Sequence, residues 1–256
     1  MKAFRRAILA TPAFALLTAC SVPGPGEAPD GIHDPYEARN RKVHEFNRSV
    51  DRTFFGEDTG TSEDAPNRVV EDFRPVVANV SDTLSLPGTV VNQLLQGRLL
   101  DASRNTLRFG VNATLGFGGM FDVADDLMNI PEDDSDFGET LAVWGAPEGA
   151  FQMLPVLGPS TQRDTVGMAV DVFLDPFVWV LEPGEALATK GVRLGADVME
   201  RAQYSDSVNS VLYESADSYA QLRLIYLQNR RFELGEPAPE AEGLPEDPLA
   251  LDTEGF

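Results

Sequence analysis

The chain has 256 residues, and 41 acidic side chains against 20 Lys and Arg give it a net charge of −21. This excess of negative charge disfavours nucleic acid as a partner and disfavours electrostatic attraction to anionic lipid head groups. The single cysteine excludes an internal disulfide bond. The length suits one large domain. Any attachment to a membrane is therefore expected to be hydrophobic or covalent.

The first residues have the pattern of a secretory signal peptide. Lys2, Arg5 and Arg6 precede an apolar run at 7–17, which is shorter than the roughly 20 residues needed to cross a bilayer. Removal of residues 1–19 would take away these three basic residues and no acid, and the net charge would become −24.

The end of this signal is a lipobox, Leu17-Thr18-Ala19-Cys20. We predict that Cys20 becomes the first residue of the mature protein and carries acyl chains on its sulfur and its amine. Two or more such chains form a stable membrane anchor. Ser21, where an Asp would favour the inner membrane, indicates the outer membrane. The alternative is an ordinary cysteine after a cleaved signal.

Composition divides the rest of the chain into a body with polar flanks. Residues 20–33 are expected to form a flexible tether. Residues 235–256 hold seven acids, four prolines and no base, a composition typical of disorder. Between them, residues 34–234 are predicted to form one helical domain, with a solvated loop at 56–66.

Apolar residues recur at helical spacing through most of the body. We therefore predict an all-α fold of seven to nine mostly short amphipathic helices, without an antiparallel sheet. The expected helical segments are 34–55, 69–84, 89–96, 99–112, 136–144, 161–175, 185–202 and 206–232.

Local signals predict several boundaries. Asp34 is expected to be the N-cap of the first helix. Pro75 predicts a kink or a helix start, and Pro87-Gly88 predicts an interruption. Thr161 is expected to cap a helix with Asp164 as its partner three residues later.

No constellation for catalysis or for metal binding is apparent. His33 lies in the predicted tether and His44 on the polar side of the first helix, so neither is placed for a Ser-His-Asp triad or for a site of several histidines. We therefore expect no enzymatic activity, no catalytic residue, no metal ligand and no cofactor other than the acyl chains on Cys20.

Acidic residues are abundant at 122–126 and 132–139. We expect them to form solvated faces, although an acid/base pair or a cation site stays open as an alternative. The glycine-rich turn Gly116–Gly119 lacks the Lys-Ser/Thr of a phosphate loop, and we expect it to allow close packing between helices.

Several stretches resemble the MlaA/VacJ family of outer-membrane lipoproteins of Gram-negative bacteria. They are DPYEARNRKVHEFNRSVD, FRPV, NQLLQG, TLRFGVNATLGFGGMFDVA, FGETLAVWG, LPVLGPSTQRDTVGMAVD and SYAQLRLIYLQNRR, and they occur in the family order over about 200 residues. The acidic loop at 56–66 and the acidic tail depart from the family pattern.

The resemblance implies a ring or disc of amphipathic helices around a central polar pore. It implies a position at the outer membrane, on its periplasmic side, lipid-anchored and partly embedded. The implied function is removal of mislocalised phospholipids from the outer leaflet and their transfer to an MlaC-like periplasmic lipid carrier, which maintains lipid asymmetry. A trimeric porin is an implied partner, and nucleic acid is not.

Within this frame we expect Asp122, Asp125 and Asp126 to lie near the pore lumen, where they would keep it hydrated and disfavour anionic head groups.

Gly145, Gly149 and Gly158 flank the least helical segment, Phe151–Leu157, and are candidate hinges of a gate; a static core loop is the alternative. Phe177 and Trp179, in the apolar run 176–181, are candidates for a membrane interface or for the core.

Another function stays open at this point. A structural lipoprotein that only scaffolds a porin or an envelope complex would have the same anchor and the same helices. Transfer of labelled phospholipid distinguishes the two, because a scaffold would co-purify with its partner without moving lipid.

Overall fold

The computed structural model describes residues 23, 28, 31–56 and 66–236. The predicted signal peptide, Cys20, the loop at 57–65 and the tail at 237–256 lie outside these residues. The all-α prediction is confirmed, since helices dominate the described chain and its sheet has two short strands.

The elements are α2 (Glu37–Phe55), α3 (Pro66–Gln96), α4 (Leu99–Thr114), α5 (Val123–Asp126), α6 (Phe137–Val143), β1 (Phe151–Leu154), β2 (Gly158–Thr161), α7 (Gln162–Leu174), α8 (Phe177–Val180), α9 (Pro183–Gln203), α10 (Ser205–Asn209), the π-helical turn η1 (Ser210–Glu214) and α11 (Ser218–Glu233).

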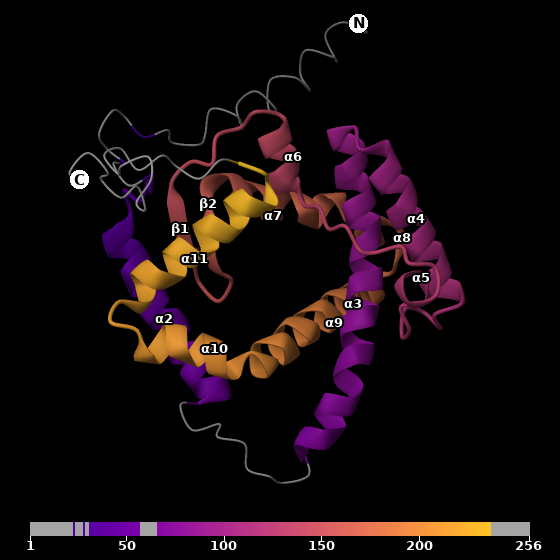
Figure 1. The fold of residues 1–256 in the computed structure, drawn as a ribbon, viewed down its shortest axis with the longest axis horizontal. Coiled ribbons are helices and arrows are strands. Elements are labelled where there is room, and N and C mark those ends of the chain that lie inside the picture. The colour runs from indigo at the N-terminus through magenta and orange to yellow at the C-terminus, as the bar shows by residue number, and fades with distance from the viewer. Residues whose placement is uncertain (1–22, 24–27, 29–30, 57–65, 237–256) are drawn as a thin grey trace, which may run out of the picture.

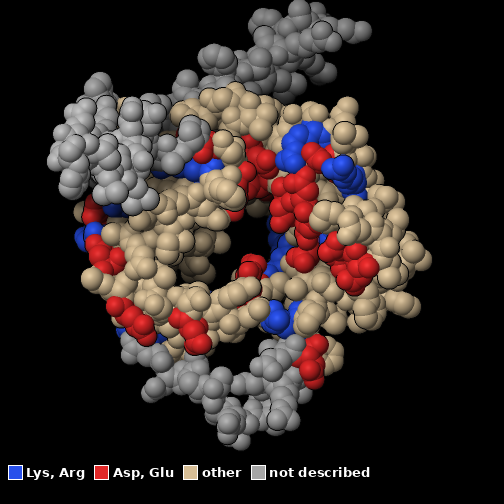
Figure 2. All heavy atoms as spheres, in the orientation of Figure 1, with Lys and Arg blue, Asp and Glu red and all other residues tan. Residues whose placement is uncertain are grey.

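These elements surround a central opening (Figure 1). Element contacts lead from α2 through β1 and β2 to α7 and α6, then to α3, α9, α10, η1 and α11. Asp51 near the end of α2 accepts hydrogen bonds from Arg201 of α9 at 2.8 Å and from Tyr213 of η1 at 2.8 Å. Helices α4, α5 and α8 lie on the outer side of α3. The circuit of contacts is thus continuous, and a hollow remains when all heavy atoms are drawn (Figure 2).

Helix α3 differs from the prediction because it runs unbroken through Pro75 and Pro87. A proline inside a helix loses one hydrogen bond and costs roughly 3 kcal/mol. Helix α3 packs against α4, α6, α7 and α9, and these tertiary contacts offset that cost. The expected interruption at Pro87-Gly88 is therefore wrong.

Two helix boundaries also differ. Asp34 does not cap α2, whose N-cap is Tyr36; its carboxylate instead accepts from Arg223 at 2.6 Å and from Tyr219 of α11. The segment predicted as one helix at 206–232 breaks at Ser215, after which Asp217 caps α11 by accepting from the Ala220 amide at 3.0 Å.

Another local prediction is confirmed, since Thr161 caps α7 by accepting from the Asp164 amide at 3.1 Å. Asp136, for which no cap was predicted, caps α6 by accepting from the Glu139 amide at 2.7 Å. The glycine-rich turn packs closely, because a Cβ on Gly119 would lie 2.6 Å from Thr83 Oγ1 of α3.

A β-hairpin replaces the loop expected at 151–157. β1 pairs antiparallel with β2, with Phe151 opposite Thr161 and Leu154 opposite Gly158. Phe151 and Met153 are buried against Tyr219 and Leu227 of α11. The segment therefore packs against α11, which its sequence alone did not predict. The expectation of no antiparallel sheet is wrong for this one two-stranded hairpin.

Side chains of α2 hold the hairpin through its backbone. Asn40 donates to the Phe151 carbonyl at 3.1 Å and accepts from the Met153 amide at 3.1 Å. Asn47 donates to the Leu154 carbonyl at 2.9 Å. Asn40 is buried, so its amide takes the place of a neighbouring strand along β1.

We predict that Asn40→Ala lowers the free energy of unfolding by about 2–3 kcal/mol, because it leaves buried backbone groups of β1 without partners. Chemical unfolding in detergent, followed by circular dichroism, measures the change. Asn229→Ala is the matched control, since Asn229 is exposed on α11 and bonds only within its helix; it should cost less than about 0.5 kcal/mol. Equal losses in the two variants would contradict the assigned role.

Candidate functional site: a polar hollow inside the ring

A cavity with a volume of about 670 Å³ lies among the elements that surround the opening. Its lining comes from α3, α7, α9 and α11, from Arg98 just before α4, and from the segment 133–139 that leads into α6. The lining residues are Ser85, Gly88, Thr89, Asn92, Arg98, Asp133, Asp134, Ser135, Asp136, Glu139, Asp171, Asp175, Arg193, Arg230, Glu233 and Leu234. All but Gly88 and Leu234 are polar or charged, so the cavity suits water and polar groups.

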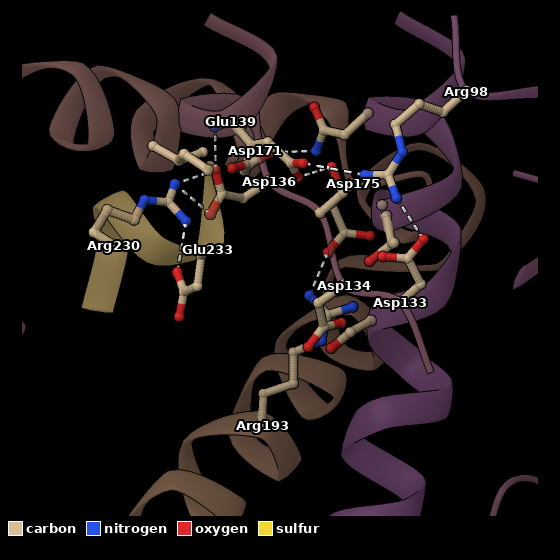
Figure 3. Close-up of a pocket in the computed structure, with 16 residues that line it drawn as sticks. Arg98, Asp133, Asp134, Asp136, Glu139, Asp171, Asp175, Arg193, Arg230 and Glu233 are labelled. Atoms are coloured by element: carbon tan, nitrogen blue, oxygen red, sulfur yellow. Dashed lines mark hydrogen bonds and ion pairs between the residues drawn. The ribbon is translucent and has the colours of Figure 1, made fainter. Parts of the chain in front are cut away.

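Arg230 of α11 organises one wall (Figure 3). Its guanidinium donates to Asp136 at 2.8 Å and to Asp164 at 3.0 Å, and it pairs with Glu233 at 3.3 Å. Burial alone would raise the pKa of Asp164, but Arg230 and hydrogen bonds from Tyr226 and Thr161 outweigh burial and leave this pKa lowered. The Arg230–Asp164 contact is thus a charged pair that joins α11 to α7.

Arg98 organises the opposite wall, where α3 meets α4. It donates to Asp101 at 2.9 Å, to Glu139 at 3.1 Å and to Asp133. These contacts fix the acidic segment 133–139 against the end of α3.

Arg193 of α9 lines the cavity and links three elements. It donates from α9 to Asp175 at 3.1 Å and to the Leu84 carbonyl of α3. Asp175 is buried at the end of α7 and also accepts from the Phe177 amide at 3.0 Å. Each of the three guanidiniums in the lining is therefore already bonded to carboxylate.

Carboxylates without a guanidinium partner of their own remain in the cavity. Asp171 accepts from Asn92 at 2.8 Å and from the Phe137 amide at 3.0 Å, and burial raises its pKa. Desolvation and repulsion from Asp133 and Asp136 raise the pKa of Asp134, although a hydrogen bond with Glu132 opposes them; Glu132 itself lies outside the lining and pairs with Arg108 at 3.7 Å. The carboxyl groups of the cavity wall thus outnumber its arginines, and the raised pKa of Asp134 reflects in part the repulsion from these acidic neighbours.

Polar side chains fill the space between α3 and α4 beside the cavity. Asn105 donates to the Asp133 carbonyl at 2.8 Å and to Gln93 at 3.1 Å. Arg108, with 2% of its surface exposed, donates to Asp122 at 2.7 Å. The buried residues of α4 are Ala102, Asn105, Arg108 and Asn112. The inner face of α4 is therefore almost entirely polar.

Many apolar side chains away from the cavity are exposed. Leu100 of α4 is 73% exposed and Trp179 of α8 is 73% exposed. Further exposed apolar side chains on α4, on the turn after it, on α8 and on α9 are Leu99, Leu107, Leu115, Phe117, Phe121, Val180, Leu187, Leu194 and Val198. Exposed apolar surface of this extent marks an interaction with a membrane or a protein. No helix in the described residues has both the length and the hydropathy needed to span a bilayer.

Residues 32–233 match the family described as MlaA lipoprotein. The chain belongs to this family. It is 29% identical over 249 residues to the intermembrane phospholipid transport system lipoprotein MlaA of Escherichia coli, covering 93% of this chain and 95% of that protein. The corresponding protein of Haemophilus influenzae is 29% identical over 238 residues, covering 91% of this chain and 92% of that protein.

A solved structure, described as the structural basis for maintenance of bacterial outer membrane lipid asymmetry, shares the fold. It superposes with a TM-score of 0.58 at 26% identity, covering 78% of this chain and 98% of that chain. The resemblance of this sequence to the MlaA family is confirmed.

The acids predicted to lie near the lumen, Asp122, Asp125 and Asp126, lie on or next to α5 and away from the cavity. Asp122 caps α5 and accepts from Arg108 and Asn112; although burial would raise its pKa, hydrogen bonds from Asn112, the Asp125 amide and Arg108 lower it. Asp125 and Asp126 are exposed on α5, which lies on the far side of α3 from the opening. None of the three lines the cavity.

The candidate hinges occupy defined turns. Gly145, Gly149 and Gly158 all have positive φ, and Val156 at the hairpin turn has φ 67°. The base of the hairpin is buried, whereas Val156 and Leu157 at its tip are exposed. The Val156 amide donates to Asn47 Oδ1 of α2 at 2.8 Å. The gate stays a prediction.

The remaining predicted residues divide between surface and interior. Phe177 is half-buried, with its ring centre 6.4 Å from that of Phe109, whereas Trp179 is exposed. His44 is buried, contrary to the prediction that it lies on a polar surface, and its Nε2 lies 2.8 Å from Ser218 Oγ of α11. Cys20 lies outside the described residues.

The cavity residues themselves were not predicted as a set. Asp134, Asp171, Asp175, Arg193 and Glu233 are far apart in sequence and meet only in the fold. The acidic run at 132–139 was the one local signal for this cavity.

A second, smaller hollow of about 320 Å³ lies between α3 and α9 and provides a test of these electrostatics. Desolvation, then repulsion from Asp134 and Asp122, raises the pKa of Asp82 in its wall to about 6. A raised carboxyl pKa means that the folded state disfavours the charged form of Asp82. The contribution of Asp82 to stability is therefore fully present at low pH, where the group is protonated, and is lost as the pH rises through about 6.

We predict that Asp82→Asn raises the free energy of unfolding by about 1 kcal/mol at pH 8, after allowance for solvent screening. The difference from the wild type should shrink through pH 6 and vanish below about pH 4. Thermal unfolding in detergent across this pH range measures it. Asp125→Asn removes a charge from an exposed position on α5 and should change little. A gain for Asp82→Asn that is absent at pH 8 would contradict the assignment.

Proposed function

We propose that this chain is a lipoprotein that moves phospholipids between membranes. In this proposal it removes mislocalised phospholipids from the outer leaflet of the outer membrane and passes them to a soluble periplasmic carrier. The observation that carries the proposal is the reversed polarity of the ring, with apolar side chains outside and charged side chains around the hollow. The names of the Escherichia coli and Haemophilus influenzae relatives agree with it.

The physical task explains why both surfaces are needed. A phospholipid that leaves a bilayer exposes its acyl chains to water at a cost of about 25 cal/mol per Å². Its head group, conversely, is costly to place in hydrocarbon. A hydrated passage inside an apolar ring keeps the head group out of hydrocarbon. A ring that lies within a leaflet shortens the distance over which the acyl chains are exposed to water. The helical backbone satisfies its own hydrogen bonds, as a bilayer requires.

The proposal assigns a location and partners. Acyl chains on Cys20 would anchor the protein to the outer membrane, and the exposed apolar faces of α4, α8 and α9 would embed the ring partly in its periplasmic leaflet. An MlaC-like carrier would receive the lipid, and a trimeric porin would be a neighbour in the membrane. No covalent chemistry is required of the protein.

The hairpin is proposed as the gate of this passage. Its tip at Val156 and Leu157 is exposed, with one hydrogen bond from the Val156 amide to Asn47, while Asn40 holds its base to α2. A disulfide formed between Asn47→Cys and Val156→Cys would pin the tip, because the Val156 amide lies 2.8 Å from Asn47 Oδ1. Lipid transfer should stop on oxidation and return on reduction; unaffected transfer would contradict the gate.

We predict that the purified acylated protein, in donor vesicles that contain labelled phospholipid, transfers this lipid to a soluble periplasmic carrier. Cys20→Ser cannot be acylated and should lower the transfer rate about tenfold at equal protein concentration, because the anchor is lost. Fluorescence dequenching measures the transfer.

Other outcomes identify other functions. Binding to a porin without lipid transfer would contradict the proposal and support a scaffolding lipoprotein. Release of free fatty acid would indicate a phospholipase instead.

A further inference from the structure

The geometry points to a charge filter: the cavity passes phospholipids with zwitterionic, amine-bearing head groups in preference to those with a net negative charge. The inference rests on the proposed function and names the substrate class that its passage favours. It is argued from the three arginines that line the cavity and from the carboxylates left over around them.

An anionic head group needs free cationic donors, and guanidinium is the best of these for phosphate. In this cavity Arg230 is bonded to Asp136 and Asp164, Arg98 to Asp101 and Glu139, and Arg193 to Asp175. A phosphate would have to displace a carboxylate from each of them. The arginines therefore hold the wall together and are not available as an anion site.

The carboxylates outnumber the guanidiniums in the lining by seven to three, and no lysine is among the lining residues. Asp134 and Asp171 form no ion pair with Arg98, Arg193 or Arg230 in the described residues, and Glu233 is half-exposed beside Arg230. In a cavity surrounded by protein, like charges repel more strongly than in bulk water. A head group with net negative charge therefore meets repulsion along this wall.

A zwitterionic head group has no net charge, so the cavity wall does not repel it as a whole. Its phosphate and its ammonium cancel at a distance, so the entry of the whole group carries no net repulsion. Once it is inside, the ammonium can approach Asp134 or Glu233, as lysine approaches carboxylates in proteins. Figure 3 shows Glu233 approaching from α11, on the side of the cavity opposite Arg98 and Asp133.

Surplus charge can be removed without breaking the wall. Asp134 is exposed to the cavity, and Glu233 makes only exposed contacts within α11, to Asn229 at 2.6 Å and to Arg230 at 3.3 Å. The double variant Asp134→Asn/Glu233→Gln removes two carboxyl groups from the cavity and keeps the Arg230–Asp164 pair. The matched control, Asp125→Asn/Asp126→Asn, removes two carboxyl groups from α5, on the other side of α3.

The experiment uses the full acylated protein in donor vesicles that contain labelled phosphatidylethanolamine and labelled phosphatidylglycerol in equal amounts. The measured quantity is the ratio of the two lipids delivered to a soluble periplasmic carrier. We expect the wild type to favour phosphatidylethanolamine by about fivefold to tenfold, and the ratio to fall toward one as salt rises from about 0.05 M to about 0.5 M. The cavity variant should reduce the preference to less than about twofold, and the α5 control should retain it.

Each other result decides against part of the account. Transfer without a preference, or a preference unchanged in the cavity variant, overturns the filter and leaves the proposed function standing. A preference lost in the α5 control and retained in the cavity variant moves the selectivity to α5, as the sequence alone predicted, and overturns the assignment to the cavity. Transfer of neither lipid overturns the proposed function and the filter with it.

Discussion

The reversed polarity of the helices is the constraint from which the rest of the structure follows. In α4, Asn105, Arg108 and Asn112 are buried while Leu100 and Leu107 are exposed. Burial of a polar group costs free energy unless it is hydrogen-bonded, and these side chains meet that cost through contacts with Asp122, Gln93 and the backbone of 130–133. The exposed leucines have no such compensation in water. The proposed partial embedding in a leaflet would place these leucines against hydrocarbon while the polar face of α4 stays inside the fold.

Charged pairs hold the ring open where an apolar core would close it. Two small apolar clusters, around Phe151 and around Phe137, support the hairpin and α6. Between elements that border the hollow, the joints are Arg230–Asp164, Arg193–Asp175 and Arg201–Asp51. Removing one partner of such a pair is strongly destabilising when the other stays buried. The same arginines keep the wall intact and leave its surplus acids facing the cavity.

Sequence patterns predicted the elements that depend on local signals. Helices α4 and α6 were expected from apolar spacing, and α7 from its cap Thr161. The sequence-based predictions were wrong where contacts between distant residues determine the structure. Helix α3 continues through Pro87 because neighbouring helices pack against it. The hairpin forms because Asn40 bonds to its backbone and Tyr219 packs against Phe151 and Met153. The luminal acids were expected on α5, whereas the cavity collects Asp134, Asp171 and Glu233 from three separate segments. The spacing of residues along one helix does not predict which helices come together to line a cavity.

Accessibility of single sites in a bilayer tests the reversed polarity most directly. Single cysteines placed by Leu100→Cys on the outer face of α4 and by Glu233→Cys in the cavity wall can carry a fluorophore, since the native Cys20 is predicted to be acylated. In reconstituted vesicles, the account predicts that lipid-attached nitroxides quench the probe at 100, whereas water-soluble iodide quenches the probe at 233. Quenching of the probe at 100 by iodide alone, together with quenching of the probe at 233 by the lipid nitroxide, would contradict the account.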